Sequence, residues 1–93
     1  MSTDFEFDRP WCVDELVAVR PEPFGALLYH YGTRRLSFLK NPTVLTIVRS
    51  LTEHPSARSA CEAAGVTPQA MPAYEQALAT LARSAMIRTR DSQ

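Results

Sequence analysis

The stretch LVAVRPEPFGALLYHYGTRRLSFLKN, residues 16–41, contains three short apolar runs, separated first by a Pro-Glu-Pro segment and then by Gly32. Runs of this length between turn-forming residues are typical of an antiparallel three-stranded meander. The stretch therefore predicts strands over residues 16–19, 26–31 and 35–39.

The third predicted strand has Leu36 and Phe38 alternating with Arg35 and Ser37. A two-residue period predicts a half-buried strand with one apolar and one polar face. The chain that follows has the pattern of helices, so it supplies no obvious partner strand. We therefore expect residues 35–39 to form an open sheet edge, which is either protected from pairing or used for it.

The second predicted strand leads into a hairpin. Gly32 with its neighbours is expected to supply the positive backbone dihedral of a tight hairpin. Pro21 and Pro23 cannot donate a backbone hydrogen bond, so the connection between the first two strands is expected to be irregular. The side chains of the second strand divide into two faces, with Leu27, Tyr29 and Tyr31 on one and Ala26, Leu28 and His30 on the other.

After the third strand the apolar period lengthens from two residues to that of a helix. Asn41 and Pro42 suit the cap and the first position of a helix that ends near residue 54. Ser56 can cap a short second helix over residues 57–64.

The third predicted helix begins after Thr67 and Pro68 or, because a proline deep in a helix removes a hydrogen bond, nearer to Pro72. It reaches about residue 84. Its apolar stripe consists of Met71, Tyr74, Leu78 and Leu81.

These elements predict an α+β, winged helix-turn-helix-like fold, in which a three-stranded antiparallel sheet is followed by three α-helices. The segment ACEAAGVT, residues 60–67, has the pattern of the turn in a helix-turn-helix. We expect one domain over residues 11–89, with Met86 and Ile87 under the sheet and a frayed tail over residues 90–93.

Residues 1–10 are acidic and contain two phenylalanines. We interpret them as a flexible acidic arm. In the alternative interpretation, the arm folds back onto the open sheet edge when no partner is present, with Phe5 and Phe7 as anchors.

The composition favours a small binding module over an enzyme. The 93 residues carry ten basic and ten acidic side chains, and a chain of this length buries about 60 to 65% of its unfolded surface, which leaves little room for a deep cavity. Cys12 and Cys61 have no motif spacing, and no signal peptide or membrane-length apolar run is present, so we expect a cytoplasmic protein with reduced thiols and no membrane partner.

Three further kinds of site find little support. A groove-reading third helix should carry several cations, but this one has only Arg83 near its end, so we expect no nucleic-acid partner. Cys12, His30, His54 and Cys61 lack metal-ligand spacing, and we expect no metal. We find no nucleophile elbow, spaced carboxylate pair or Gly-rich loop, and we expect no catalysis.

Arg34 and Arg35 begin the predicted edge strand. In one interpretation they are solvated charges that discourage aggregation at the edge. In the other, one of them pairs with an acidic residue of an incoming peptide through its planar fork.

The runs VRPEPFGALLYHYGTRRLSFLKNPTVLTIVRSL and HPSARSACEAAGV resemble the small precursor-binding proteins of mycofactocin biosynthesis. More broadly they resemble the PqqD-like recognition domains that serve ribosomally made, post-translationally modified peptides. The resemblance covers residues 16–87, and its specific part is residues 21–51. The proline-rich connection and the acidic arm are not general features of PqqD-like domains.

The resemblance implies a non-catalytic chaperone without a cofactor. A precursor (leader) peptide would add as a further strand to residues 35–39, lie against the third helix and be handed to a radical S-adenosylmethionine (SAM) maturase. The implied peptide-binding residues are Arg34, Arg35, Leu36, Ser37, Phe38, Leu39, Tyr74, Glu75, Leu78 and Ala82.

Two rival functions remain open at this point, a winged-helix DNA-binding regulator and a structural subunit of a larger enzyme. The structural subunit would expose a large apolar patch when alone. An open edge also permits a strand-exchanged homodimer.

Overall fold

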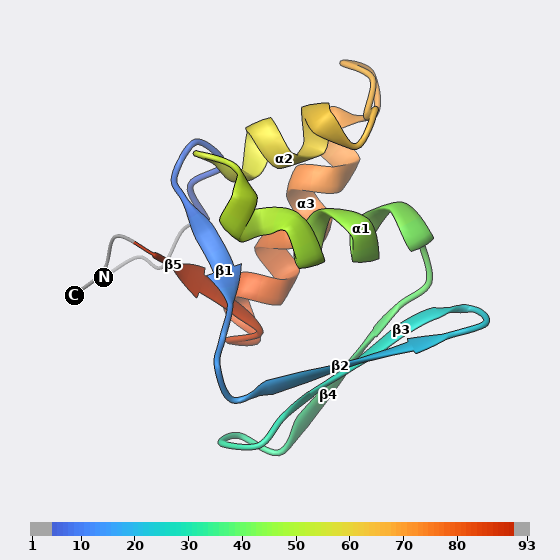
Figure 1. Cartoon of the computed structure of the whole chain (residues 1–93), viewed down its shortest axis with the longest axis vertical. Coiled ribbons are helices and arrows are strands. Elements are labelled where there is room, and N and C mark those ends of the chain that lie inside the picture. The colour runs from blue at the N-terminus through green and yellow to red at the C-terminus, as the bar shows by residue number, and fades with distance from the viewer. Residues whose placement is uncertain (1–4, 91–93) are drawn as a thin grey trace.

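The computed structural model describes residues 5–90. The α+β chain places a three-stranded antiparallel sheet on one side and its helices on the other, with a small two-stranded sheet beside the helices (Figure 1). The strands are β1 (Trp11–Val13), β2 (Val17–Glu22), β3 (Gly25–His30), β4 (Arg35–Leu39) and β5 (Ile87–Thr89). The helices are α1 (Pro42–Ser50), the short 3-10 helix η1 (Leu51–Glu53), α2 (Ala57–Ala63) and α3 (Met71–Arg83).

The predicted meander is confirmed as the sheet β2-β3-β4, and the bounds of β4 agree with those predicted. The irregular first connection is wrong, because β2 runs through Pro21 to Glu22 and pairs Glu22 with Gly25. Proline is tolerated since β2 is itself an edge strand. Gly25 has φ +146°, and a Cβ there would lie 1.8 Å from the Leu39 carbonyl oxygen, so the tight turn requires glycine.

One predicted face of β3 is the buried one: Ala26, Leu28 and His30, which were expected to share a face, are all buried. The expected burial of the apolar face of β4 is wrong, because Leu36 and Phe38 are 55% and 61% exposed. The register explains this difference, since it pairs Leu36 with Tyr29 and Phe38 with Leu27, on the face away from the buried residues of β3.

The helix caps follow the sequence signals. Asn41 accepts the N–H of Thr43 at 2.8 Å, and Ser56 accepts the N–H of Ser59 at 3.0 Å. The later start of α3 is correct, since the helix begins at Met71 with Pro72 in its first turn, where no hydrogen bond is lost. The first helix is shorter than predicted and continues as the 3-10 turn η1.

The two-stranded sheet was not predicted. It pairs β1 with β5 in antiparallel fashion, with Val13 opposite Ile87. Met86 and Ile87 are buried, as expected, but Ile87 lies in this sheet. The frayed tail is wrong at Arg90, whose N–H donates to the Pro10 carbonyl at 2.9 Å and whose guanidinium donates to the Thr52 and His54 carbonyls. Residues 91–93 lie outside the described part of the chain.

Residues 5–10 pack against the domain and do not form the loose arm that we expected. Phe7 is only 4% exposed, the Trp11 indole donates to the Glu6 carbonyl at 2.8 Å, and Asp8 pairs with Arg58 at 2.6 Å. The Phe7 carbonyl also accepts the Arg58 N–H. This segment therefore covers the start of α2 and not the edge of β4; residues 1–4 of the predicted arm lie outside the description.

Candidate functional site

The open edge of β4 is the most distinctive feature of the sheet. Within residues 5–90, β4 pairs with β3 on one side and with no strand on the other, because β5 joins β1. The unpredicted strand β5 therefore leaves the predicted edge of β4 open. Such an edge presents unpaired N–H and C=O groups that can template another strand.

The direction of these backbone groups can be derived from the ladder. Tyr31 donates its N–H to Leu16, on the β2 side, and the His30 carbonyl accepts a bond from Arg34, on the β4 side. Because directions alternate along an antiparallel strand, even-numbered residues of β3 face β4. The backbone groups of Ser37, which pairs with Leu28, consequently face β3. The backbone groups of Leu36 and Phe38 face the open edge.

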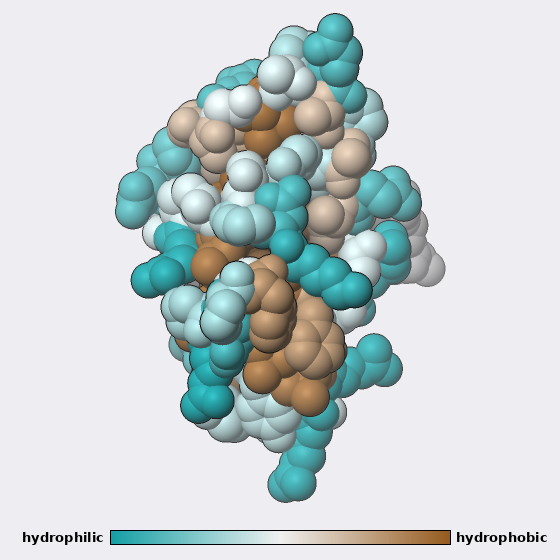
Figure 2. All heavy atoms as spheres, turned by 90° about the vertical axis from the view of Figure 1, so that its right-hand side faces the viewer, coloured by the Kyte–Doolittle hydropathy of each residue, from teal (hydrophilic) through white to brown (hydrophobic). Residues whose placement is uncertain are grey.

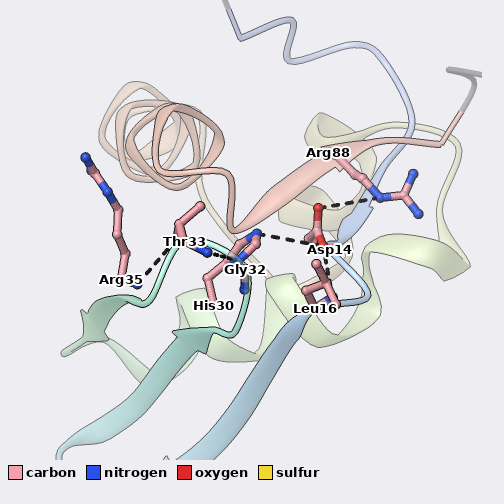
Figure 3. A network of polar contacts seen from close by, with 7 residues as sticks. All are labelled: Asp14, Leu16, His30, Gly32, Thr33, Arg35 and Arg88. Atoms are coloured by element: carbon pink, nitrogen blue, oxygen red, sulfur yellow. Dashed lines mark hydrogen bonds and ion pairs between the residues drawn. The ribbon is translucent and has the colours of Figure 1, made fainter.

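A cluster of polar contacts fixes the turn that leads into β4 (Figure 3). The Nδ1 atom of His30 accepts the N–H groups of Gly32 and Thr33 at 3.0 and 3.1 Å. Its Nε2 atom lies 3.8 Å from Asp14, whose carboxylate also lies 3.9 Å from Arg88 Nε. The turn is thus connected to both sheets.

Gly32 has a different role from the one predicted. The positive φ predicted for Gly32 and its neighbours is present in the turn, but it belongs to Arg34, at 64°, and not to Gly32 itself. A Cβ at Gly32 would lie 2.9 Å from Cε1 of His30. Gly32 is therefore needed for the close approach of the imidazole.

The predicted residues of α3 occupy different depths. Leu78 is fully buried in the core, which places it beneath the surface that a peptide could touch. Tyr74, Glu75 and Ala82 are partly buried. The Tyr74 hydroxyl accepts a hydrogen bond from the Asn41 side chain at 3.0 Å, which ties the chain just after β4 to the first turn of α3.

The sheet segment is basic. Residues 16–41 carry four cations, Arg20, Arg34, Arg35 and Lys40, against one carboxylate, Glu22, a net charge of +3. In the described residues, the ion pairs join Arg9, Arg58 and Arg88 to carboxylates outside this segment. The four cations of the sheet segment are therefore available to an acidic partner.

Sequence reasoning missed the outer face of the sheet, the face turned away from the buried residues Ala26 and Leu28. On it lies a shallow pocket of about 250 Å³, and hydrophobic side chains gather over the sheet in Figure 2. The signal was present, because β3 is apolar at both parities, which is typical of a strand covered on both faces. The pocket is lined by Ala18, Arg20, Leu27, Tyr29, Tyr31 and Leu36.

A model of the peptide chaperone MftB family matches residues 10–88, which include strands β1 to β4, the described helices and the first two residues of β5. The chain belongs to the peptide chaperone MftB family. The match begins just before β1 and ends within β5, so most of the unpredicted two-stranded sheet falls inside the family domain.

Curated relatives agree with this assignment. A protein of Mycobacterium ulcerans named peptide chaperone MftB is 60% identical over 83 residues, which are 89% of this chain and 76% of the relative. Proteins of the same name from Mycobacterium tuberculosis and Mycolicibacterium smegmatis are 55% and 57% identical, over 92% and 89% of this chain and 79% and 81% of their own lengths. No solved structure matches the chain.

Two other kinds of feature are absent from the described residues. No group of three or more His, Cys, Asp or Glu side chains in them is placed to hold a metal ion. None of the helices between residues 5 and 90 is long and apolar enough to cross a membrane.

Proposed function

We propose that this chain is a non-catalytic, cytoplasmic chaperone of mycofactocin biosynthesis that binds the leader part of the precursor peptide. The peptide adds as a strand to the open edge of β4, at Leu36 and Phe38, and is presented there to a radical SAM maturase. The observation that carries the proposal is the unpaired edge of β4 in a member of a peptide chaperone family.

Charge supports an acidic stretch in the peptide. Arg34 and Arg35 stand at the start of β4, and neither has an ion pair within the described residues. A carboxylate of the peptide that paired with one of them would fix the register of the added strand, because the guanidinium fork is directional. Tyr74, Glu75 and Ala82 of α3 are partly buried, and Tyr74 is hydrogen-bonded to Asn41, just after β4.

Backbone pairing alone gives too little affinity. Four main-chain hydrogen bonds at about 1 kcal/mol each contribute about 4 kcal/mol. A micromolar complex needs about 8 kcal/mol after the costs of association. Apolar anchors worth about 1.5 to 3 kcal/mol each must therefore supplement the strand.

The direct test compares Phe38→Pro with Phe38→Ser in a titration with a mycofactocin precursor peptide. Both variants lose the ring, but only proline removes the N–H that faces the open edge. We expect Phe38→Pro to bind at least about fivefold more weakly than Phe38→Ser, the value of about one hydrogen bond. Equal affinities, with both variants retaining the wild-type pattern of backbone amide signals, would rule out edge pairing.

A parallel titration with random duplex DNA tests the rival regulator. The proposal predicts amide shifts along β4 with the peptide and none with the duplex. Shifts with the duplex alone, centred on α3 and Arg83, would favour the DNA-binding function.

A further inference from the structure

The outer face of the sheet exposes large apolar side chains next to the open edge. Leu36 and Phe38 lie on β4 itself, and both are more than half exposed. The Phe38 ring lies 6.2 Å from that of Phe24, and Leu36 forms part of the shallow pocket. The apolar surface is therefore continuous with the backbone groups that an added strand would use.

The ladder determines where the side chains of an added strand would lie. In an antiparallel pair, residues opposite each other place their side chains on the same face, about 4.5 to 5.5 Å apart at Cβ. The peptide residues that pair with Leu36 and Phe38 would accordingly point to the outer face. Every second residue of the peptide would meet an exposed apolar side chain there.

The helical side of the edge offers weaker apolar anchors. On that side, β4 presents Arg35, Ser37 and the buried Leu39. Leu78 of α3 is also buried and closed to a ligand. The anchors that backbone pairing requires are therefore supplied chiefly by Leu36 and Phe38, on the opposite face from the one the sequence predicted.

Charge decides which occupant suits this face. A second copy of the chain would bring the same basic sheet segment, with its net charge of +3, against the first. The like charges of two such segments in contact oppose association, whereas a peptide rich in carboxylates is attracted to the segment. Arg35 lies on the helical side of β4, so it would meet the residues between the outward-facing ones.

We propose that the outer face is a specificity surface for the bound peptide. This inference rests on the proposed function. Alternate residues of the strand that joins β4 carry large apolar side chains, which pack beside Leu36 and Phe38. A residue between them carries a carboxylate, which pairs with Arg35. The ligand class is thus an acidic peptide with large apolar residues at every second position.

The test measures affinity for the precursor peptide after Leu36→Ser and Phe38→Ser, which keep the backbone donors. Since each site anchors one large apolar side chain, each variant is expected to bind about tenfold to a hundredfold more weakly. Serine substitution of the apolar peptide residues that pair with Leu36 and Phe38 should produce losses of the same size, whereas substitution of a carboxylate should lose its effect in Arg35→Ala.

Arg20→Ser is the matched control. Arg20 is exposed and lines the same face, but it lies on β2, three strand spacings or about 14 Å from the added strand. Arg20→Ser removes one of the four sheet cations, but a charge farther away than the Debye length is largely screened. The substitution should therefore weaken peptide binding by at most about twofold, far less than Phe38→Ser. Because Leu36 and Phe38 are exposed, their serine variants should also keep the helical signal in circular dichroism.

Two results would overturn the inference. If Leu36→Ser and Phe38→Ser bind like the wild type while Phe38→Pro is weaker than Phe38→Ser, edge pairing stands and the outer face is not read. If Arg20→Ser loses as much affinity as Phe38→Ser, a partner covers the whole sheet. Contacts between the Leu36 methyl groups and the peptide, observed as intermolecular nuclear Overhauser effects, would independently support the outer face as the specificity surface.

Discussion

The imidazole of His30 replaces a backbone carbonyl in the turn before β4, since its Nδ1 atom accepts the N–H of Gly32 at 3.0 Å. His30 is 5% exposed, so this bond is shielded from water. The geometry also requires Gly32 to have no side chain, because a Cβ would contact the ring at 2.9 Å. The starting point of the edge strand therefore depends on one histidine and one glycine.

Gly32→Ala should destabilise the domain by about 1 to 3 kcal/mol, because the added methyl group must displace the His30 ring. Chemical denaturation measures the change. Gly65→Ala is the matched control: Gly65 has φ +89°, and a methyl group added there would meet no atom within 4 Å, so its cost of about 1 to 2 kcal/mol comes from the backbone alone. Unlike Gly65→Ala, Gly32→Ala should shift the amide signals of β4. Unchanged β4 signals in Gly32→Ala would contradict the steric explanation.

Asn41→Ala should lower the free energy of unfolding by about 1 to 2 kcal/mol. The substitution removes the N-cap bond to Thr43 and the bond to Tyr74 together. Tyr74→Phe removes only the second bond and should cost less than Asn41→Ala. The double variant should lose less stability than the sum of the losses of the two single variants. Full additivity would show that the Asn41–Tyr74 bond contributes nothing.

The ion pair between Asp8 and Arg58 should make the stability depend on pH in the acid range. The hydrogen bond that Arg58 donates to the Asp8 carboxylate lowers the pKa of Asp8 below the ordinary value of 3.8. A lowered pKa means that the stabilisation is complete above about pH 3.8 and is lost as the pH falls through the folded-state pKa. Melting temperatures measured from pH 2 to 6 should fall less steeply for Asp8→Asn, and a parallel decline would exclude this pair as a source.

Cys61 should react slowly in the native protein. It is fully buried in α2, and desolvation raises the pKa of its thiol from 9.0 to about 11. The unfolded chain ionises first, so stability should decline as the pH rises above about 9. Iodoacetamide labelling at pH 8 should modify Cys61 only on unfolding, and Cys61→Ala should flatten the alkaline decline. Rapid labelling of the folded chain would contradict the burial.

The contrast between strands β3 and β4 explains how far sequence reasoning reached. Turn residues and alternation located β4 to the residue, and cap residues located α1 and α2 well. The face of β4 was assigned wrongly because apolar residues occur at both parities of β3, so the pattern does not say which side the helices cover. Register decides that question, and register depends on the turn geometry at His30 and Arg34.

The three-residue strands β1 and β5 illustrate a different limit. Segments of that length have no measurable hydrophobic period. In addition, β1 and β5 pair with each other although they lie far apart in the sequence. Phe7 was considered only as an anchor at the sheet edge, since two phenylalanines in an acidic stretch do not reveal that Phe7 packs against Arg58 of α2. The proposed peptide-binding residues of β4 were within reach of the sequence, whereas the exposure of Leu36 and Phe38 was not.

The pairing of β1 with β5 also constrains how the protein is made. Trp11, which is buried, belongs to a strand whose neighbour, β5, is synthesised much later than β1. Contacts so distant in sequence form late, because a long loop must close first. On the ribosome, the meander and α1 can assemble before β1 has a partner. The native core is therefore completed only after the C-terminal strand has emerged, and a chain released before residue 87 has no β5 with which to pair β1.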